Sequence, residues 1–541
     1  MKRPLADGNL DGHSGPTVNT IADSPLTVPI FRALWIATIV SNTGTWMQDV
    51  GAGWLMTSLS RSPLLVAAVQ AATTLPMFVL SMPAGALADI VDRRRLLIVT
   101  QCWTVMGAAL LSIVTFIGLC TPVMLLAMIG AIAIGMTLGA PAFQATVPEL
   151  VSPTALPRAV ALLSLGVNIS RAIGPAAGGL VIAATGGPAA VFALNAISSI
   201  GVAMVLIRWR RAPSKTALPA EHFLGALQAG VRYTWQSPAM LTVLLRSASF
   251  FVFASALWAL LPIIGRRNLA LGSTGYGALL ACLGIGAIAG ALSLRRISGR
   301  ISCNALMLSA SILFAAAMAL LGVARTFAVA APIMCAAGIA WITIMSSLMG
   351  AAQMAAPAWV KARALAIYML VSQGTMAVGS TCWGWFAAHT SVQVALLAAG
   401  AALGVAQLLA LRFPLDASAK LDLSPASDWP APQVDGAVQN DRGPVLVTIE
   451  YRIDPAKSTE FANAMARLQS SRRRDGALRW GLYEDAAQPG LFVETFIVGS
   501  WIEHLRQHER VTRADRQCEE TVRQFHIGTQ APLVRHLITP A

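Results

Sequence analysis

Acidic side chains are rare in the apolar part of this sequence, so each one is a candidate for proton chemistry. Between positions 30 and 412 the chain contains only Asp49, Asp89, Asp92, Glu149 and Glu221. A carboxylate surrounded by apolar groups can take up and release a proton near neutral pH. Asp49 stands apart from the other four, inside an apolar stretch. We therefore expect Asp49 to handle protons; an edge aspartate in contact with water is the alternative.

One arginine, Arg171, lies in the middle of another apolar stretch, "NISRAIGPAAGGL" (168–180). The helical pattern begins near Pro157, which places Arg171 about 14 residues, or roughly 21 Å, along the helix. A guanidinium at that depth needs an anion, carbonyl groups or water. We expect Arg171 to bind an anionic substrate group; backbone carbonyls and Asn168 are the alternative partners. Amides that could line the same path, or make helix–helix hydrogen bonds instead, are Asn42, Gln48 and Gln373.

The surroundings of these residues indicate a membrane protein. Of the 541 residues, 56% are hydrophobic and only 12% are charged, whereas soluble domains are near a quarter charged. Apolar runs long enough to cross about 30 Å of hydrocarbon recur along the chain. They predict an all-α membrane protein with twelve transmembrane helices, near residues 31–58, 63–88, 96–119, 122–147, 158–184, 188–208, 242–264, 275–294, 302–323, 327–352, 363–388 and 391–411.

The basic residues predict how these helices are oriented. Most Lys and Arg fall in segments on one side of the predicted membrane, whereas the other side carries only Arg61, Arg266, Arg267 and Arg325. By the positive-inside rule we expect a multi-pass protein of the cell (inner) membrane with both termini in the cytoplasm. The net charge of +14 is then explained by topology. The lipid bilayer is the expected partner, and nucleic acid is not.

Polar segments divide the chain. Residues 209–238 form the longest polar break among the helices, and their later part has the apolar spacing of an amphipathic helix. The expected organisation is a cytoplasmic polar tail (1–28), an N-terminal six-helix half (29–208), a central loop (209–238), a C-terminal six-helix half (239–412), a linker (413–443) and a soluble domain (444–541).

The last segment has a different pattern from the rest. Strand and helix patterns follow one another at Val445–Tyr451, 456–472, Leu478–Tyr483, Leu491–Ile497, 501–525 and Leu533–Leu537. This β-α-β-β-α-β order is typical of an α+β ferredoxin-like domain.

A loop motif resembles the signature of a known protein family. The segment "GALADIVDRRR" (85–95) resembles the loop signature of the major facilitator superfamily, although Ile90 and Asp92 depart from it. The signature positions are occupied by Gly85, Asp89, Arg93 and Arg94. A weaker copy begins at Gly290. The repeat implies the two six-helix halves of the major facilitator fold. A capped helix end with adjacent basic residues is the alternative interpretation.

Glu149 ends the fourth predicted helix and could reach the same loop. We expect Glu149 to pair with Arg93 or Arg94, and Asp89 to face the positive end of a neighbouring helix. Both contacts would latch the two halves together on the inner side. The motif is therefore interpreted as a gating element.

The opening stretch resembles a second signature of the superfamily, found on helix five of exporters and formed here by Gly174, Pro175, Gly178 and Gly179. Gly174 and Gly178 share one helix face and allow close approach of a neighbour, and Pro175 favours a bend. Close packing without gating is the alternative. With longer stretches such as "FRALWIATIVSNTGTWMQ", residues 30–412 are similar to the transmembrane secretion effector branch, which includes enterobactin exporters.

The soluble domain resembles the antibiotic-biosynthesis-monooxygenase type of dimeric α+β barrel, through its element order and "ETFIVGSWIEHLRQH" (494–508). In that family a Trp and a His on this helix can lie near a cofactor-independent oxygenation pocket, and Trp501, His504 and His508 fall within two turns here. Ordinary packing is the favoured reading of these residues. We expect no metal site, no cofactor and no catalytic residues. The domain is expected to be a regulatory, dimerising or substrate-modifying module.

Together the resemblances imply a secondary transporter that exports small amphipathic molecules, such as a drug, siderophore or secondary metabolite, by alternating access with proton coupling. Two alternatives remain open. One is a membrane-anchored cofactor-independent oxygenase carried by residues 444–541. The other is a receptor that binds without transporting.

Overall fold

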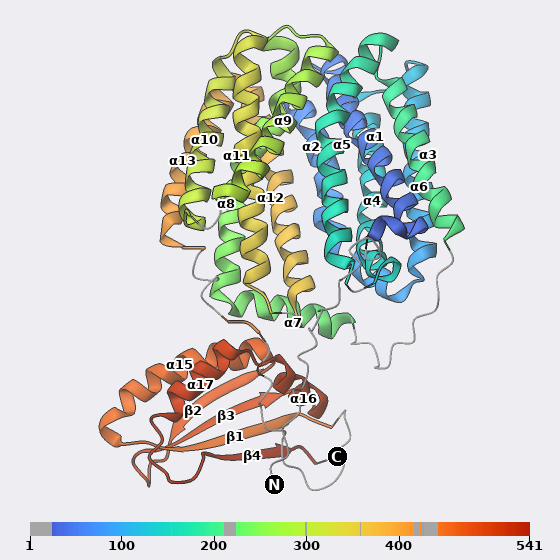
Figure 1. Ribbon diagram of the computed structural model, residues 1–541. Coiled ribbons are helices and arrows are strands. Elements are labelled where there is room, and N and C mark those ends of the chain that lie inside the picture. The colour runs from blue at the N-terminus through green and yellow to red at the C-terminus, as the bar shows by residue number, and fades with distance from the viewer. Residues whose placement is uncertain are drawn as a thin grey trace, which may run out of the picture.

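The computed structural model describes residues 24–152, 154–209, 223–297, 300–357, 359–415, 422–424, 426 and 442–540. Long helices form a bundle, and a smaller α+β domain lies at one end of it (Figure 1). We call this end the near end and the opposite one the far end. Most of the expected polar tail, much of the central loop and most of the linker lie outside the described residues.

Six helices form the first helix group. They are α1 (Pro29–Leu59), α2 (Pro63–Ile90), α3 (Arg93–Phe116), α4 (Pro122–Leu150), α5 (Leu156–Thr185) and α6 (Ala189–Arg208). Proline lies in the first turn of α1, α2, α4 and α5, where its missing N–H costs no hydrogen bond. Within the group α1 packs against α5 and α6, α2 against α4, and α3 against α4 and α6.

Six more helices form the second helix group. They are α8 (Pro238–Ile263), α9 (Ser273–Ile297), α10 (Cys303–Val323), α11 (Phe327–Met354), α12 (Lys361–His389) and α13 (Val392–Leu409). A π-helical turn, η2 (Ile264–Asn268), continues α8. Here α8 packs against α12 and α13, α9 against α11, and α10 against α11 and α13. The rings of Phe250, Phe314 and Trp341 meet at the centre of this group.

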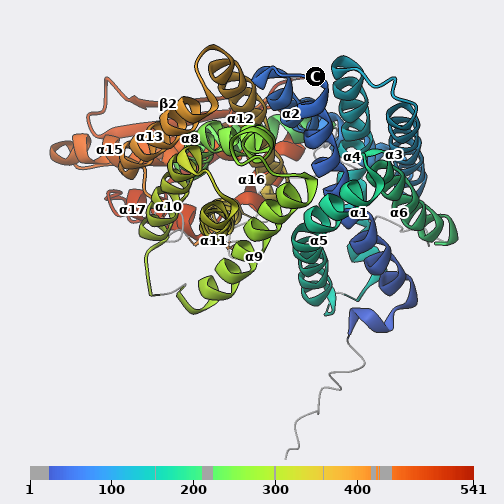
Figure 2. The same cartoon turned by 90° about the horizontal axis from the view of Figure 1, so that it is seen from above.

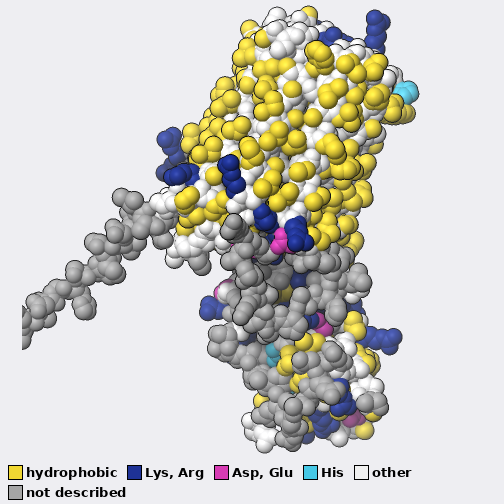
Figure 3. Space-filling model, turned by 90° about the vertical axis from the view of Figure 1, so that its right-hand side faces the viewer, with side chains coloured by type: hydrophobic (Ala, Val, Ile, Leu, Met, Phe, Trp, Pro, Cys, Tyr) yellow, Lys and Arg dark blue, Asp and Glu magenta, His cyan; other side chains and the backbone are white. Residues whose placement is uncertain are grey.

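Among the described residues, eleven helices are long and apolar enough to cross a membrane, one fewer than the sequence predicts. The helix that falls short is α1, although it has 31 residues. Its polar side chains, among them Asn42, Gln48 and Asp49, lower its mean hydropathy. Hydrophobic side chains cover the visible face of the bundle, and basic side chains lie mainly toward its ends (Figure 3).

The two groups meet along two helix pairs. Viewed along the bundle, the groups lie side by side, with α5 next to α9 and α2 next to α12 (Figure 2). Smaller contacts join α8 to α1 and α2. These contacts hold the two groups together.

The C-terminal domain has the predicted order of elements. It contains β1 (Val445–Arg452), α15 (Ser458–Asp475), β2 (Arg479–Glu484), β3 (Leu491–Val498), α16 (Trp501–Arg510), α17 (Arg513–Arg523) and β4 (Leu533–Ile538). The strands form an antiparallel sheet in the order β2-β3-β1-β4. The prediction of one helix over 501–525 was wrong. Thr512 and Asp515 form a capping box that starts a second helix, so the first one ends at Arg510.

This domain contacts the bundle through the amphipathic helix α7 (Phe223–Gln236), which packs against both α12 and α15. The Tyr233 hydroxyl donates to the carbonyl of Ala355 at 2.6 Å. The guanidinium of Arg474 lies 5.8 Å from the centre of the Tyr233 ring, and that of Arg510 lies 4.8 Å from the ring centre of Trp359. Cation–π contacts thus connect the domain to the second helix group.

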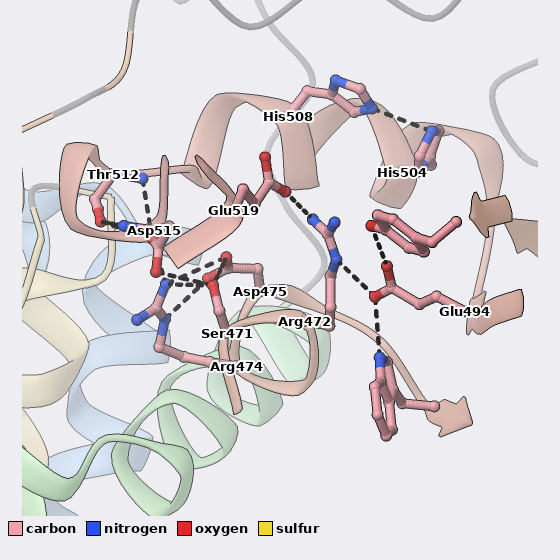
Figure 4. A network of polar contacts seen from close by, with 12 residues as sticks. Ser471, Arg472, Arg474, Asp475, Glu494, His504, His508, Thr512, Asp515 and Glu519 are labelled. Atoms are coloured by element: carbon pink, nitrogen blue, oxygen red, sulfur yellow. Dashed lines mark hydrogen bonds and ion pairs between the residues drawn. The ribbon is translucent and has the colours of Figure 1, made fainter. Parts of the chain in front are cut away.

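A chain of buried ion pairs organises the domain behind these contacts (Figure 4). The Arg472 guanidinium lies 3.2 Å from Glu494 Oε1 and 2.6 Å from Glu519 Oε1. Glu494 is fully buried and also accepts hydrogen bonds from Trp480 and Tyr451. Burial alone would lower the pKa of Arg472, but the carboxylates of Glu519 and Glu494 raise it above its ordinary value. Arg472 is therefore charged and compensates two buried carboxylates.

Replacing Arg472 should destabilise the domain strongly. Arg472→Met removes the cation and leaves Glu494 and Glu519 without their shared partner, which should cost about 3–5 kcal/mol. Arg473→Met is the matched control, because Arg473 is exposed on the same helix. Thermal unfolding and amide hydrogen exchange of the C-terminal domain in the full chain measure the difference. Equal exchange in the two variants would contradict the assignment.

Candidate functional site

Helix α5 presents a seam of small residues to α1, spaced four apart: Gly166, Ser170, Gly174 and Gly178. A Cβ atom at Gly174 would lie 2.5 Å from the Trp46 Cβ, and one at Gly178 would lie 3.0 Å from the Met47 Cα. The Ser170 hydroxyl donates to the Ile39 carbonyl at 2.9 Å. Small residues at this spacing let two helices pack backbone to backbone. Gly174 and Gly178 therefore join α5 to a helix of its own group.

The neighbouring face of α5 crosses α9 of the second helix group. A Cβ at Gly179 would lie 2.6 Å from the Ser273 carbonyl oxygen and 3.0 Å from the Gly277 Cα. A Cβ at Gly277 would lie 2.6 Å from the Pro175 carbonyl oxygen. Neither position leaves room for a side chain. Within the motif identified in the sequence, Gly179 and Pro175 therefore lie at the contact between the groups.

Arg171 lies on α5 one turn before Pro175. Its guanidinium carbon is 5.3 Å from the ring centre of Trp46. Its Nε is buried and has no hydrogen-bond partner among the described residues. Asn168 does not supply one, because its amide donates to the Ser164 carbonyl at 2.9 Å. Within the described chain, the alternative partners considered from the sequence do not engage this nitrogen.

Asp49 lies on α1 and is partly buried. Tyr276, the residue before Gly277 on α9, approaches the next turn of α1, because a Cβ at Gly53 would lie 3.3 Å from its hydroxyl oxygen. Tyr276 stacks on Trp54 of α1, with ring centres 5.9 Å apart. Asp49 is therefore placed where the first helix group contacts the second.

The three amides have different surroundings. Gln48 is 3% exposed, and its side-chain oxygen accepts a 2.8 Å hydrogen bond from the Asn195 amide on α6. Gln48 thus makes the helix–helix hydrogen bond that the sequence left open as the alternative. Asn42 on α1 and Gln373 on α12 are partly buried. They remain candidate path residues.

The loop motif lies within the first helix group. Arg93 Nη1 donates to Glu149 Oε1 at 2.7 Å, as expected, but this pair joins α3 to α4 and does not connect the two groups. Arg94 Nε donates to the Leu206 carbonyl at the end of α6. A Cβ at Gly85 would meet nothing within 4 Å. The Asp89 side chain lies outside the described atoms.

A contact that sequence reasoning missed joins the groups at the far end. Arg266 lies over the Trp54 ring at 5.0 Å and donates to the Thr57 hydroxyl at 3.0 Å. Arg267 donates to the Arg61 carbonyl at 2.9 Å. We call these residues the far-end clamp. Because the partners are some 200 positions apart in sequence, with separations of 209 and 206, spacing gave no signal for them.

An apolar groove of about 740 Å³ lies elsewhere, between α12 and α13, lined by Trp383, Trp385, Phe386 and Ala398 among others. None of the candidate residues described above lines it. We therefore do not assign it to the candidate path.

The predicted aromatic and histidine group on α16 does come together. Trp501 and His504 are 3% and 2% exposed, and their ring centres lie 5.4 Å apart. His504 and His508 point toward each other (Figure 4), with 3.2 Å between their Nε2 atoms. His536 of β4 packs against His504, with ring centres 4.8 Å apart. The sequence did not indicate His536.

Comparison with known proteins then identifies the family. The family model described as transmembrane secretion effector matches residues 20–541. The chain belongs to this family. The match extends through the C-terminal domain, beyond the 30–412 segment on which the resemblance rested.

Among relatives of this transmembrane secretion effector, the enterobactin exporter EntS of Escherichia coli O1:K1 / APEC is 27% identical over 331 residues, which cover 60% of this chain and 76% of that protein. The staphyloferrin A transporter of Staphylococcus aureus is 27% identical over 164 residues, 30% of this chain and 41% of that protein. The Shigella boydii serotype 4 enterobactin exporter is 28% identical over 48% of this chain and 61% of its own length. The last two matches thus span less than two thirds of those proteins.

Solved structures show the same fold. A bacterial homologue of the human lysosomal transporter Spinster, in an inward-facing and occupied conformation, has a TM-score of 0.58 at 14% identity, over 73% of this chain and 98% of that chain. The nucleoside transporter NupG has a TM-score of 0.55 at 13% identity, over 71% of this chain and 99% of that chain. At these identities the likeness concerns the fold alone.

The two faces of α5 can be told apart by substitution. Gly179→Leu should push α5 away from α9, because overpacking costs about 1–3 kcal/mol, and should speed amide exchange where these helices face each other. Gly178→Leu should instead loosen α5 from α1. Gly201→Leu is the control, because a Cβ there meets nothing within 4 Å. The assignment fails if Gly179→Leu leaves exchange in α9 as slow as the control does.

Proposed function

We propose that this transmembrane secretion effector is a secondary transporter that exports a siderophore-like small molecule across the cell membrane by alternating access. Family membership over residues 20–541 carries the proposal. Two curated relatives support it, one named as an enterobactin exporter and one as a staphyloferrin A transporter. The fold, shared with solved transporters, agrees with it. A transporter of this kind is not an enzyme.

The arrangement we propose has twelve spans in two halves, residues 29–208 and 239–412, with the near end and both termini in the cytoplasm. The length of α1 and its packing against α5 and α6 support counting it as a membrane span, in addition to the eleven helices found by hydropathy among the described residues. The excess of basic residues at the near end supports the orientation. The remaining parts of the proposed division are the tail (1–28), the central loop (209–238), the linker (413–443) and the soluble domain (444–541).

Alternating access requires that contacts between the halves open and close. The far-end clamp and the Gly179–Gly277 crossing both join the halves, and both lie toward the far end. They support a state that is closed at the far end and accessible from the near end. Release of substrate to the outside would then require Arg266 to leave α1 and Arg267 to leave the loop that follows α1.

The C-terminal domain is proposed to pair with a second copy, as dimeric barrels of the antibiotic-biosynthesis-monooxygenase type do. Its β-α-β-β-α-β order supports the relationship. Apolar side chains on its outer strands also support it, since Tyr483, Val534 and Leu537 are 63%, 46% and 51% exposed. Burial of these side chains by a partner would be favourable.

Arg171 is proposed to bind an acidic group of the substrate. Its guanidinium lies against Trp46 and its Nε lacks a protein partner among the described residues, which leaves a donor available for a carboxylate or phenolate oxygen.

Arg171→Ala should therefore reduce export by roughly tenfold or more, because a charged hydrogen bond contributes about 1.5–3 kcal/mol. Arg171→Lys should export little better than Arg171→Ala, since lysine lacks the planar donor pair of arginine. Transport of enterobactin and staphyloferrin A by proteoliposomes provides the measurement. Arg158→Lys, at the exposed start of the same helix, should transport normally. Wild-type rates in both Arg171 variants would make it a packing residue.

Proton coupling is proposed to use Asp49. This carboxylate lies on α1 one turn before Gly53 and Trp54, which face Tyr276 of the other half. It is also the acid in the membrane part that the predicted topology does not place at the cytoplasmic face.

A single assay can test both export and coupling. Proteoliposomes would be loaded with a pH-sensitive dye and supplied with enterobactin or staphyloferrin A, and the parent protein should move protons only when substrate is present. Asp49→Asn keeps the shape and removes titration, so it should abolish this proton movement while substrate binding persists. Asp92→Asn is the control, because asparagine also caps a helix. Substrate transport without proton movement in the parent would reject the coupling, whereas no transport of any test substrate would count against export itself.

A further inference from the structure

Three histidines of the C-terminal domain converge from two elements. His504 and His508 lie four residues apart on α16, and His536 lies on β4. One ring nitrogen of each lies within 4.8 Å of those of the other two. His504 is buried and the other two are partly buried. Histidines spaced four apart on a helix present their rings on one face, as in helical zinc sites.

The geometry points to a binding site for a divalent transition-metal ion, Zn²⁺ in the first place, formed by His504, His508 and His536. Zinc–nitrogen distances are about 2.0–2.1 Å, so two nitrogens of a tetrahedral site lie about 3.3 Å apart. The His504 and His508 Nε2 atoms are 3.2 Å apart. A change in the ring orientation of His536 would complete three ligands. Imidazole ligands favour zinc, copper and nickel over magnesium or calcium.

The surroundings of the three rings leave one ring nitrogen without a partner and enclose the cluster on one side. The His504 Nδ1 is buried and has no hydrogen-bond partner among the described residues. Trp501 packs against His504 and His536 and restricts water on one side.

The position of the site gives it a structural consequence. An ion held by all three rings would join α16 to β4. The same helix ends at Arg510, which lies over Trp359 of the bundle and donates to the Asp475 carbonyl at 3.0 Å. Metal binding would therefore fix α16, one of the two helices of the domain whose arginines contact α7 or the bundle. Glu503, on the same helix, is already paired with Arg506 and Arg510 and is not a ligand.

Metal titration of the full-length protein in detergent, without a histidine tag and stripped of metal, tests the inference. We expect one Zn²⁺ per chain by calorimetry, and Co²⁺ should show the visible bands of a four-coordinate nitrogen site. His508→Gln and His536→Gln should each weaken binding by roughly tenfold or more. Zn²⁺ should slow amide exchange in both α16 and β4 of the parent.

His526→Gln is the matched control, because His526 lies in the same domain outside the cluster and its Nδ1 accepts from the Arg452 N–H. Its affinity should equal that of the parent. Far-UV circular dichroism of the metal-free variants checks that each one is folded. Unchanged affinity in either His508→Gln or His536→Gln would overturn the site. So would binding by the parent no tighter than that of a variant in which all three histidines are glutamine.

Discussion

The backbones of the two helix groups approach each other closely where α5 crosses α9, and the arrangement of the groups depends on this contact. At Gly179 and Gly277 a single added Cβ would lie 2.6 Å from a carbonyl oxygen. In lipid, such packing replaces the hydrophobic effect as the force between helices. At these two glycines the contact is made by the backbones themselves. The seam toward α1, in contrast, combines glycines with the Ser170 hydrogen bond and favours a fixed pair.

Charged side chains are paired differently in the helix bundle and in the C-terminal domain. In the bundle, Arg171 and Asp49 stand without compensating ion pairs among the described residues, which suits groups that bind and release charged species. In the C-terminal domain, Arg472 is matched by Glu494 and Glu519, which suits a rigid scaffold. The two parts thus differ in whether a buried charge has an ion-pair partner among the described residues.

Much of the fold was predictable because length and periodicity are local properties. The sheet elements, α7 and the Arg93–Glu149 pair were found in this way. Features that depend on contacts between residues far apart in the sequence could not be predicted. Gln48 pairs with Asn195, and Arg266 reaches Thr57; neither partner could be read from spacing. His536 lies on a separate strand from the other two histidines, and the capping box at Thr512 was overlooked within an apparently continuous helical pattern.

The C-terminal domain is attached to the second helix group. The domain contacts α7 and Trp359, and α7 itself is fastened to the second group by the Tyr233–Ala355 hydrogen bond. These contacts tie the domain and α7 to the second helix group. If the domain pairs with a second copy as proposed, the two membrane bundles of the dimer would be connected to each other through their second helix groups.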